Sequence, residues 1–345
     1  MPSSLHIEQI AELAGVSRST VSRVLNNHPS VRPEVRQRVQ RVIDENGYAP
    51  RAAARSLASR RTQVVGLLIP RSAGTIFSDP FFGSVIQGVA EAVQKRSYFL
   101  MLSMMTADME PGFYNRILKG GHFDGLIMLS SDIDDPILPL LIRDQMPLVL
   151  IGCHPFFQNV ASVDVDNRAG AREGVVHLIK LGHRRIGTIT GPLHMVAGLE
   201  RRDGYKQALL EAGIPIVPEL IVTGDFTQES GYQRMRELLA LPVRPTAVFI
   251  ASDTMSVGAL RAIHEAGLNI PEGIAVVSFD DLPVASYANP PLTTVYQPIV
   301  QLGASAVELL IDGFDDPQRR LAQIRLPTHL VVRASCGATR YALET

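Results

Sequence analysis

The sequence predicts an N-terminal all-α helix-turn-helix domain with a hinge helix, followed by an α/β core of two doubly wound parallel-sheet subdomains. Three observations predict this fold class. Residues 7–27 contain two short amphipathic segments separated by a glycine. From residue 64 onward, short apolar runs alternate with helical segments, the pattern of parallel sheets covered by helices. The length of 345 residues, of which 46% are hydrophobic, suits two or three domains.

The first two helices are predicted from apolar residues that recur at the spacing of one buried face. These are Ile7, Ile10, Ala11 and Ala14 in the first helix and Val16, Val21, Val24 and Leu25 in the second. Gly15 can adopt the left-handed conformation that ends a helix, and the Ser17 hydroxyl can cap the next one. The exposed side of the second helix then carries Arg18, Ser19, Ser22, Arg23 and Asn26. This layout is a helix-turn-helix suited to the major groove of DNA.

A third helix is predicted over 33–46, because Pro33 suits a first turn and Gly47 ends the segment. Residues 51–61 (RAAARSLASRR) follow, with helix-favouring alanines but one large apolar residue, Leu57. A segment of this length is too short to be a stable helix alone in water. It is therefore a plain linker or a segment that folds on binding. We divide the chain into a domain over 1–50, a hinge over 51–61 and a core over 62–345.

The charge distribution separates the N-terminal part from the core. Residues 1–61 carry ten arginines, no lysine and five acidic residues, whereas the remainder carries 23 basic and 29 acidic residues. A basic N-terminal part on an acidic core indicates a polyanion as partner of the N-terminal part alone.

The core is predicted from short apolar runs, read as strands, and longer amphipathic segments, read as helices. The strands begin near residues 64, 99, 124, 147, 185, 247 and 274. The helices cover 82–95, 201–212, 229–239 and 253–266. Two such series predict two similar subdomains, with a ligand between them at the carboxyl ends of their strands.

Other features exclude several classes of protein. Cys153 and Cys336 form no disulfide framework and no metal-binding spacing, and His154 beside Cys153 has no further ligands in its neighbourhood, so we expect no metal and no cofactor. The N-terminus lacks the features of a secretory signal, and no apolar run approaches about 18–20 residues. These features predict a cytoplasmic protein without a membrane segment.

A transport solute-binding protein and an enzyme are the two alternatives to a DNA-binding regulator. A transport solute-binding protein would have a similar core, but it predicts a signal peptide and no basic N-terminal part. An enzyme would need a nucleophile with its base or a phosphate loop, and neither G-x-S-x-G nor G-x-x-x-x-G-K-[ST] occurs. We therefore expect no enzymatic activity.

Eight segments together resemble the lactose-repressor/galactose-repressor (LacI/GalR) family of bacterial transcription regulators, and the resemblance covers essentially the whole chain. They are AGVSRSTVSRVLNN (14–27), ARSLA (54–58), DPFFGSVIQG (79–88), VDVDNRAGAREGVVHLIKLGHRRIG (163–187), RRDGY (201–205), GDFTQESGY (224–232), SDTMSVGALRAI (252–263) and VVSFDD…PPLTTV (276–295). The resemblance implies a homodimeric repressor that binds a pseudo-palindromic operator in double-stranded DNA. It also implies a periplasmic-binding-protein-like core in which the chain crosses between subdomains three times. The expected N-subdomain is about 62–162 and 293–325, and the C-subdomain about 163–292 and 326–345.

The resemblance implies roles for residues in the helix-turn-helix and the hinge. Arg18, Ser19 and Arg23 would touch base edges, where an arginine can form a bidentate contact with guanine. Phosphate contacts would come from Ser17, Thr20 and Ser22, with Asn26 on the same exposed side. In the hinge, Leu57 would enter the minor groove as an apolar wedge. Because Ala54 and its alanine neighbours are small, Leu57 is the only wedge-sized side chain of the hinge, and phosphates would lie near Arg51 and Arg55.

The resemblance also implies a ligand site in the core, formed by Phe81, Ser131, Arg201, Phe226, Ser252 and Asp280. Arg201 supplies hydrogen-bond donors and Asp280 accepts them, while the two phenylalanines offer flat apolar faces. Such a set suits a small polar effector, with a sugar or sugar derivative favoured and a nucleoside or purine as the alternative. Ligand binding would change the angle between the subdomains and so the hinge and the DNA affinity. The sequence leaves open whether the ligand releases or promotes DNA binding.

Overall fold

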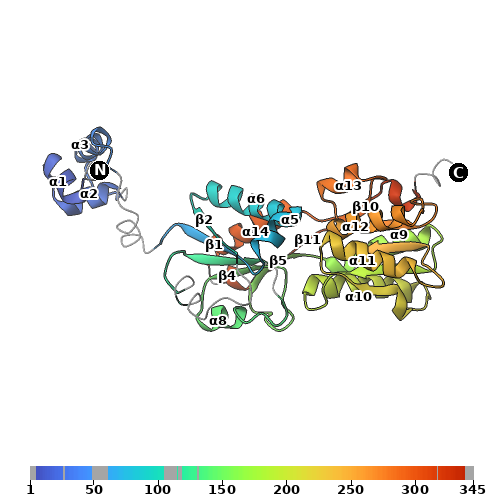
Figure 1. Ribbon diagram of the computed structural model, residues 1–345. Coiled ribbons are helices and arrows are strands. Elements are labelled where there is room, and N and C mark those ends of the chain that lie inside the picture. Colours follow the sequence, from blue (N-terminus) through green and yellow to red (C-terminus); the bar gives the residue numbers. More distant parts are fainter. Residues whose placement is uncertain are drawn as a thin grey trace. The chain divides into compact units, whose positions relative to one another are not determined.

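The computed structural model describes residues 5–25, 28–48, 61–104, 115, 119–129, 132–316 and 318–338 (Figure 1). The chain divides into two compact units, Met1–Gln63 and Val64–Thr345, and this division falls close to the predicted end of the hinge at residue 61. Most of the predicted hinge, residues 51–60, lies outside the described residues. Within the described ranges, no helix is long and apolar enough to cross a membrane.

The described residues of the first unit form three helices, α1 (Ile7–Leu13), α2 (Arg18–Leu25) and α3 (Pro33–Glu45). Their buried side chains form one small core, and they are Ile10, Ala11, Ala14, Val21, Val24, Val39 and Ile43. Gly15, with φ of 61°, ends the first helix as predicted. The backbone N–H of Thr20 donates to Ser17 Oγ at 3.2 Å, so Ser17 caps α2. The predicted helix-turn-helix is therefore confirmed.

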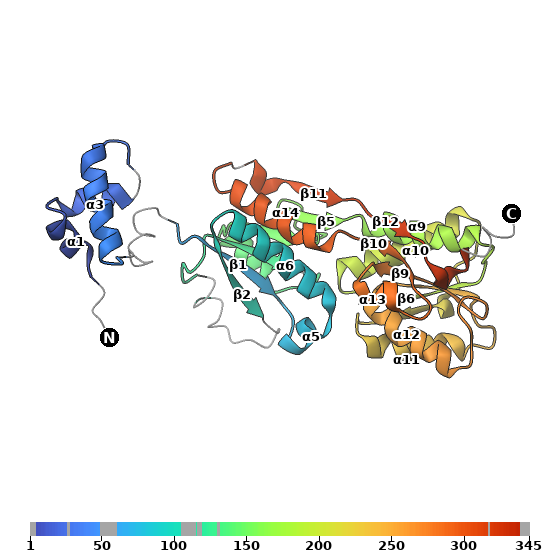
Figure 2. The same ribbon diagram turned by 90° about the horizontal axis from the view of Figure 1, so that it is seen from above.

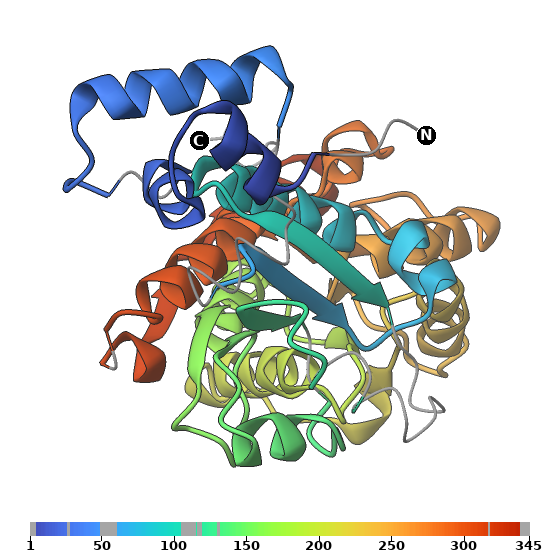
Figure 3. The ribbon, with the colours of Figure 1, turned by 90° about the vertical axis from the view of Figure 1, so that its left-hand side faces the viewer.

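The N-subdomain contains a six-stranded parallel sheet. Its strands, in spatial order, are β11 (Gln323–Leu326), β5 (Ala161–Val165), β4 (Leu148–Ile151), β3 (Gly125–Leu129), β1 (Val64–Ile69) and β2 (Phe99–Met104). Successive side chains point to opposite faces, so Leu67 packs against α6 (Pro80–Lys95) and α14 (Ile299–Asp312), whereas Leu68 packs against α8 (Leu138–Arg143). Figure 3 shows strands of this sheet between helices. A short helix, α5 (Ala73–Ser78), follows β1.

The C-subdomain repeats this design with a second six-stranded sheet. Its strands are β12 (His329–Val331), β10 (Thr293–Tyr296), β9 (Ala275–Asp280), β8 (Ala247–Ile250), β6 (Ile186–Thr190) and β7 (Ile221–Thr223). One face is covered by α11 (Gln228–Leu239) and α12 (Asp253–Glu265), the other by α9 (Asn167–Lys180) and α10 (Val196–Glu211). The strands run parallel except that β12 is antiparallel to β10. Its shorter elements are α13 (Pro283–Tyr287), η2 (Pro218–Leu220) and η4 (Ala334–Cys336), whereas η3 (Arg319–Leu321) packs against α14 and β5 of the N-subdomain.

The chain passes between the two sheets after β5, after β10 and between β11 and β12. Figure 2 shows these strands lying near the junction of the two subdomains. Two of the expected subdomain boundaries differ from the structure by a few residues. Residues 163–165 complete β5 in the first sheet, and residues 293–296 form β10 in the second. The resemblance gave these boundaries only approximately. The sequence offered no sharper limit for β5, because Ser162 and Asp164 are polar although both are buried.

Candidate functional site

The exposed face of α2 carries the side chains that sequence analysis assigned to DNA. Val21 and Val24 are buried in the core, which leaves Arg18, Ser19 and Arg23 exposed on the opposite side. Thr20 and Ser22 lie half-buried beside them. Asn26 lies outside the described residues, as do Arg51, Ala54, Arg55 and Leu57 of the hinge.

Polar contacts within this unit pre-arrange the start of α2. Ser17 Oγ lies 2.8 Å from Ser19 Oγ and 2.9 Å from Thr20 Oγ1. The Arg18 guanidinium forms an ion pair with Glu8 of α1, with an N–O distance of 3.2 Å and both side chains more than half exposed. An exposed pair of this kind contributes little, about 0–1 kcal/mol, so Arg18 can exchange Glu8 for another acceptor.

The core contains a cavity of about 690 Å³ lined by residues of both subdomains. Five of the six predicted ligand residues line it, namely Phe81, Arg201, Phe226, Ser252 and Asp280. The sixth, Ser131, lies outside the described residues. The five come from different elements: the first turn of α6, α10, the loop before α11, the residue before α12 and the end of β9. A cavity at the carboxyl ends of parallel strands is the usual place for a ligand in such folds.

Arg201 and Asp280 form a buried ion pair at the floor of this cavity, 3.1 Å apart and each about 5% exposed or less. The Arg201 guanidinium also donates to Asn167 Oδ1 at 2.9 Å and to the carbonyl of Ala251 at 2.6 Å. The central carbon of this guanidinium, Arg201 Cζ, lies 3.7 Å from the ring centre of Phe279. Asp280 accepts a further hydrogen bond from Gln297 Nε2 at 2.5 Å. Burial raises the pKa of the Asp280 carboxyl to about 8 even though Arg201 opposes this shift.

The position of Phe226 follows from its backbone conformation and a contact with Gly191, and that of Ser252 from a helix cap. Phe226 has φ of 68°, and its ring lies against Gly191, where an added Cβ would be 2.2 Å from the ring. The ring is thus held at the cavity wall, 6.0 Å from the Arg201 guanidinium. The Ser252 hydroxyl accepts from the N–H of Met255 at 3.2 Å and so caps α12. Its hydroxyl is already engaged in the helix, which sequence reasoning did not foresee.

The structure adds cavity residues that sequence analysis missed. Asp79, which precedes α6, accepts from the N–H of Phe81 at 3.1 Å and from Thr254 Oγ1 at 3.0 Å. The second bond joins the N-subdomain to the C-subdomain. Arg71 and Asp132 form an ion pair at 2.6 Å on the N-subdomain side. The Asp79-Pro80 pair was a visible helix-start signal, but contacts between residues far apart in sequence leave no local pattern.

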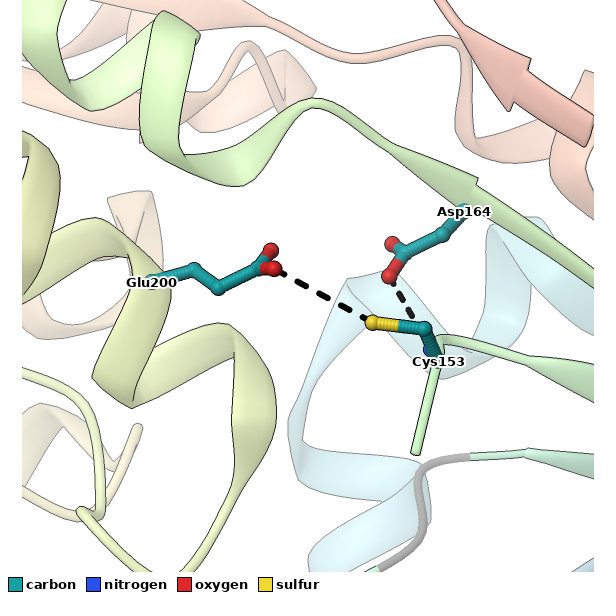
Figure 4. Close-up of side chains that lie close together, drawn as sticks. All are labelled: Cys153, Asp164 and Glu200. Carbon is teal, nitrogen blue, oxygen red and sulfur yellow. Dashed lines mark hydrogen bonds between the residues drawn. The ribbon is translucent and has the colours of Figure 1, made fainter. Parts of the chain in front are cut away.

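One cluster beside the cavity has the side-chain types of a metal site. The ligand atoms of Cys153, Asp164 and Glu200 all lie within 4.8 Å of one another (Figure 4). However, burial raises the pKa of the Cys153 thiol to about 12, which disfavours the thiolate that binds metals. The Arg325 guanidinium lies 3.9 Å from both the thiol sulfur and a Glu200 oxygen. A protonated thiol and a nearby cation account for this cluster, and we assign no ion to it.

Comparison with known proteins gives two family matches within the chain. Residues 6–51 match the model "Bacterial regulatory proteins, lacI family", and residues 175–336 match a periplasmic binding protein-like domain. The HTH-type transcriptional regulator CelR of Thermobifida fusca is 41% identical over 332 residues, which are 95% of this chain and 97% of that protein.

Solved structures give the same result at the level of the fold. The complex of the transcriptional regulator CelR with cellobiose is 40% identical, with a TM-score of 0.77, and covers 96% of this chain and 99% of that one. The lac repressor dimer bound to operator and the anti-inducer ONPF is 28% identical, with a TM-score of 0.85, and covers 97% and 99%. The fold is therefore shared with regulators that were solved in complex with cellobiose or with ONPF.

Proposed function

Because the chain belongs to the lacI family of bacterial regulatory proteins, we propose that it is a sequence-specific transcriptional repressor controlled by a small polar ligand. The observation that carries this proposal is that one chain has both an exposed, arginine-bearing α2 and a cavity between two subdomains. A sugar or sugar derivative is the effector class, and CelR in complex with cellobiose makes cellobiose the first ligand to test.

The reading helix is α2, with base contacts from Arg18, Ser19 and Arg23 and phosphate contacts from Ser17, Thr20 and Ser22. The exposed position of both arginines supports these roles. Asn26 and the hinge residues Arg51, Ala54, Arg55 and Leu57 complete the DNA interface by resemblance. Two copies of the chain bind one pseudo-palindromic operator, as expected for a dimer.

The effector is held by Arg201 and Asp280, with Phe81 and Phe226 as apolar walls and Ser131 and Ser252 at the edge. The buried pair at the cavity floor supports this assignment, because its donors and acceptors meet the hydroxyl groups of a sugar. The protein acts in the cytoplasm and does not turn its ligand over. The similarity to regulators along nearly the whole chain favours this reading over an enzyme.

Selection of binding sites from a random duplex library tests the proposal, run with purified protein in the presence and absence of cellobiose. An enriched palindrome establishes dimeric operator recognition, and its dependence on cellobiose gives the sign of regulation. A pooled set of other sugars and nucleosides identifies the effector if cellobiose has no effect. Binding that is weak, salt-dependent and without an enriched site would contradict the regulator and favour a solute-binding protein.

A further inference from the structure

The charged side chains that line the cavity are unevenly balanced. Among the residues that the structure describes, the lining contains five aspartates, which are Asp79, Asp132, Asp164, Asp225 and Asp280. Against them stand two arginines, Arg71 and Arg201, and the exposed His194. This surplus of carboxylates bears on which ligands can enter.

Both arginines are already engaged by partners from the cavity itself. Arg71 donates through both terminal nitrogens to Asp132, at 2.6 and 3.3 Å, and to the carbonyl of Pro70 at 2.7 Å. Arg201 is bound by Asp280, Asn167 and a backbone carbonyl and lies on the Phe279 ring. Each guanidinium already neutralises one carboxylate, so a phosphate bound beside it would bring a second negative charge to the same cation. Separating Arg201 from Asp280 would also leave a buried cation without its partner, which is costly.

The other three carboxylates accept hydrogen bonds from neutral donors. Asp79 is bound by Thr254 and a backbone N–H, and Asp225 by the N–H and hydroxyl of Thr227 at 2.9 and 2.6 Å. Asp164 accepts from the N–H groups of Cys153 and Val165 and from Asn167. Burial raises the pKa of Asp79 and of Asp164, so negative charge is already disfavoured here. An anionic ligand would add charge of the same sign in a poorly solvated space.

We infer that the cavity selects uncharged, hydroxyl-rich ligands and rejects the phosphorylated forms of the same molecules. A hydroxyl group of a neutral ligand can donate to the carboxylates. The ring of that ligand can pack on Phe81 or Phe226 without disturbing either arginine. The Arg71–Asp132 pair is the specificity determinant, because Asp132 neutralises the partly exposed Arg71 guanidinium that would otherwise bind phosphate. This inference rests on the proposed effector cavity and narrows its ligand class.

Isothermal titration with matched ligand pairs tests the selectivity. The pairs are cellobiose with cellobiose 6′-phosphate, glucose with glucose 6-phosphate, and adenosine with adenosine monophosphate. For every pair with measurable binding, we expect the protein to bind the neutral member with at least tenfold higher affinity than the phosphorylated member. A phosphorylated member that binds as tightly as its neutral partner overturns the inference.

A second measurement does not depend on knowing the sugar. Inorganic phosphate is titrated into the wild-type protein, into Asp132→Asn and into Asp134→Asn, an exposed change on the same loop outside the cavity lining. Circular dichroism verifies that each variant is folded. We expect Asp132→Asn to gain at least tenfold in phosphate affinity while wild type and Asp134→Asn stay equal. Tight phosphate binding by wild type, or no gain in folded Asp132→Asn, overturns the inference.

The two proposals fail separately. A protein that selects no operator but binds neutral sugars and rejects phosphorylated ones would refute the repressor and leave the selectivity intact. A protein whose operator binding responds to a phosphorylated sugar would support the repressor and refute the selectivity.

Discussion

Asp280 is a side chain whose ionisation should be visible in the stability of the whole core. Burial raises its pKa to about 8, whereas an exposed aspartate has a pKa of about 4. A raised folded-state pKa means that the folded protein holds the proton more tightly than the unfolded chain. The stability from this proton is complete below about pH 4 and is lost as the pH rises through about 8.

Burial also raises the pKa of the neighbouring Asp253, and the two carboxyls titrate together. We therefore predict that the unfolding free energy of the ligand-free protein falls by on the order of 1 kcal/mol as the pH rises from 7 to 8.5 through this carboxyl pair. The neutral isostere Asp280→Asn should show a flatter profile over the same range, because it cannot titrate. His177 and His183 do not interfere, since burial lowers the pKa of both below 6.5. Chemical unfolding at constant ionic strength measures both profiles. Parallel slopes in the two proteins would show that Asp280 is not the titrating group.

Arg23 carries the sharpest residue-scale prediction for DNA. Its exposed side chain on α2 is free of the core, so truncation should leave the fold unchanged. Arg23→Ala should cost about 1–3 kcal/mol on the selected operator and relax specificity at one base position. Arg38→Ala, an equally exposed arginine on α3, is the matched control for loss of charge. Equal losses in both variants, measured by fluorescence anisotropy, would reduce Arg23 to a phosphate contact.

At the scale of elements, the close packing of α6 against α14 requires a glycine at one position of the sequence. A Cβ added at Gly88 of α6 would lie 1.9 Å from the carbonyl oxygen of Val300 in α14. Gly83 lies on the same helix, is exposed and has open space around it. Substitution of Gly88 therefore tests the packing of the two helices, whereas substitution of Gly83 tests only the intrinsic cost of glycine in a helix.

Gly88→Ala should destabilise the core by about 1–3 kcal/mol, because the two helices must move apart. Gly83→Ala should instead stabilise it by about 0.5–1 kcal/mol, since alanine is the better helix former. Thermal unfolding of both variants measures the difference. A similar, stabilising effect of both substitutions would mean that the helices are not in close contact at Gly88.

The hinge element gives a prediction that rests on sequence resemblance alone, since Leu57 lies outside the described residues. Leu57→Ala should reduce binding to the selected operator far more than binding to a scrambled duplex, because a wedge acts only where the duplex can be kinked. Titration of both duplexes at one salt concentration measures the two losses. A uniform loss would assign Leu57 to general packing.

Helices and strands could be predicted from the sequence where apolar residues recur regularly. They could not be predicted where the buried residues are polar. The helix-turn-helix and the apolar strands β1, β3, β4, β8 and β9 follow the predicted ranges closely. The strands β5, β7, β10, β11 and β12 were not predicted, because β7 and β12 are only three residues long and the other three contain polar residues. The ligand cavity was predicted through Arg201 and Asp280, whereas Asp79 and Arg71 join it only through tertiary contacts.

At the scale of the whole core, ligand response depends on contacts that join the two subdomains across the cavity. The hydrogen bond from Thr254 Oγ1 to Asp79 Oδ1, at 3.0 Å, is such a contact. It links the start of α12 to the start of α6, on either side of the cavity. A ligand that binds this arrangement of subdomains benefits from every bond that stabilises it, because the population of the binding-competent state sets the apparent affinity.

Thr254→Val removes the hydroxyl while keeping the shape, and Asp79 is left with one donor fewer in a buried position. Loss of such a bond costs about 0.5–1.5 kcal/mol, so effector affinity should fall roughly two- to tenfold. Thr254→Ser retains the hydroxyl and should keep affinity close to wild type. Titration with the effector found in the selection experiment measures all three proteins. If valine and serine variants bind equally, the bond does not stabilise the ligand-binding arrangement, and control of the subdomain angle must come from the other contacts between the subdomains.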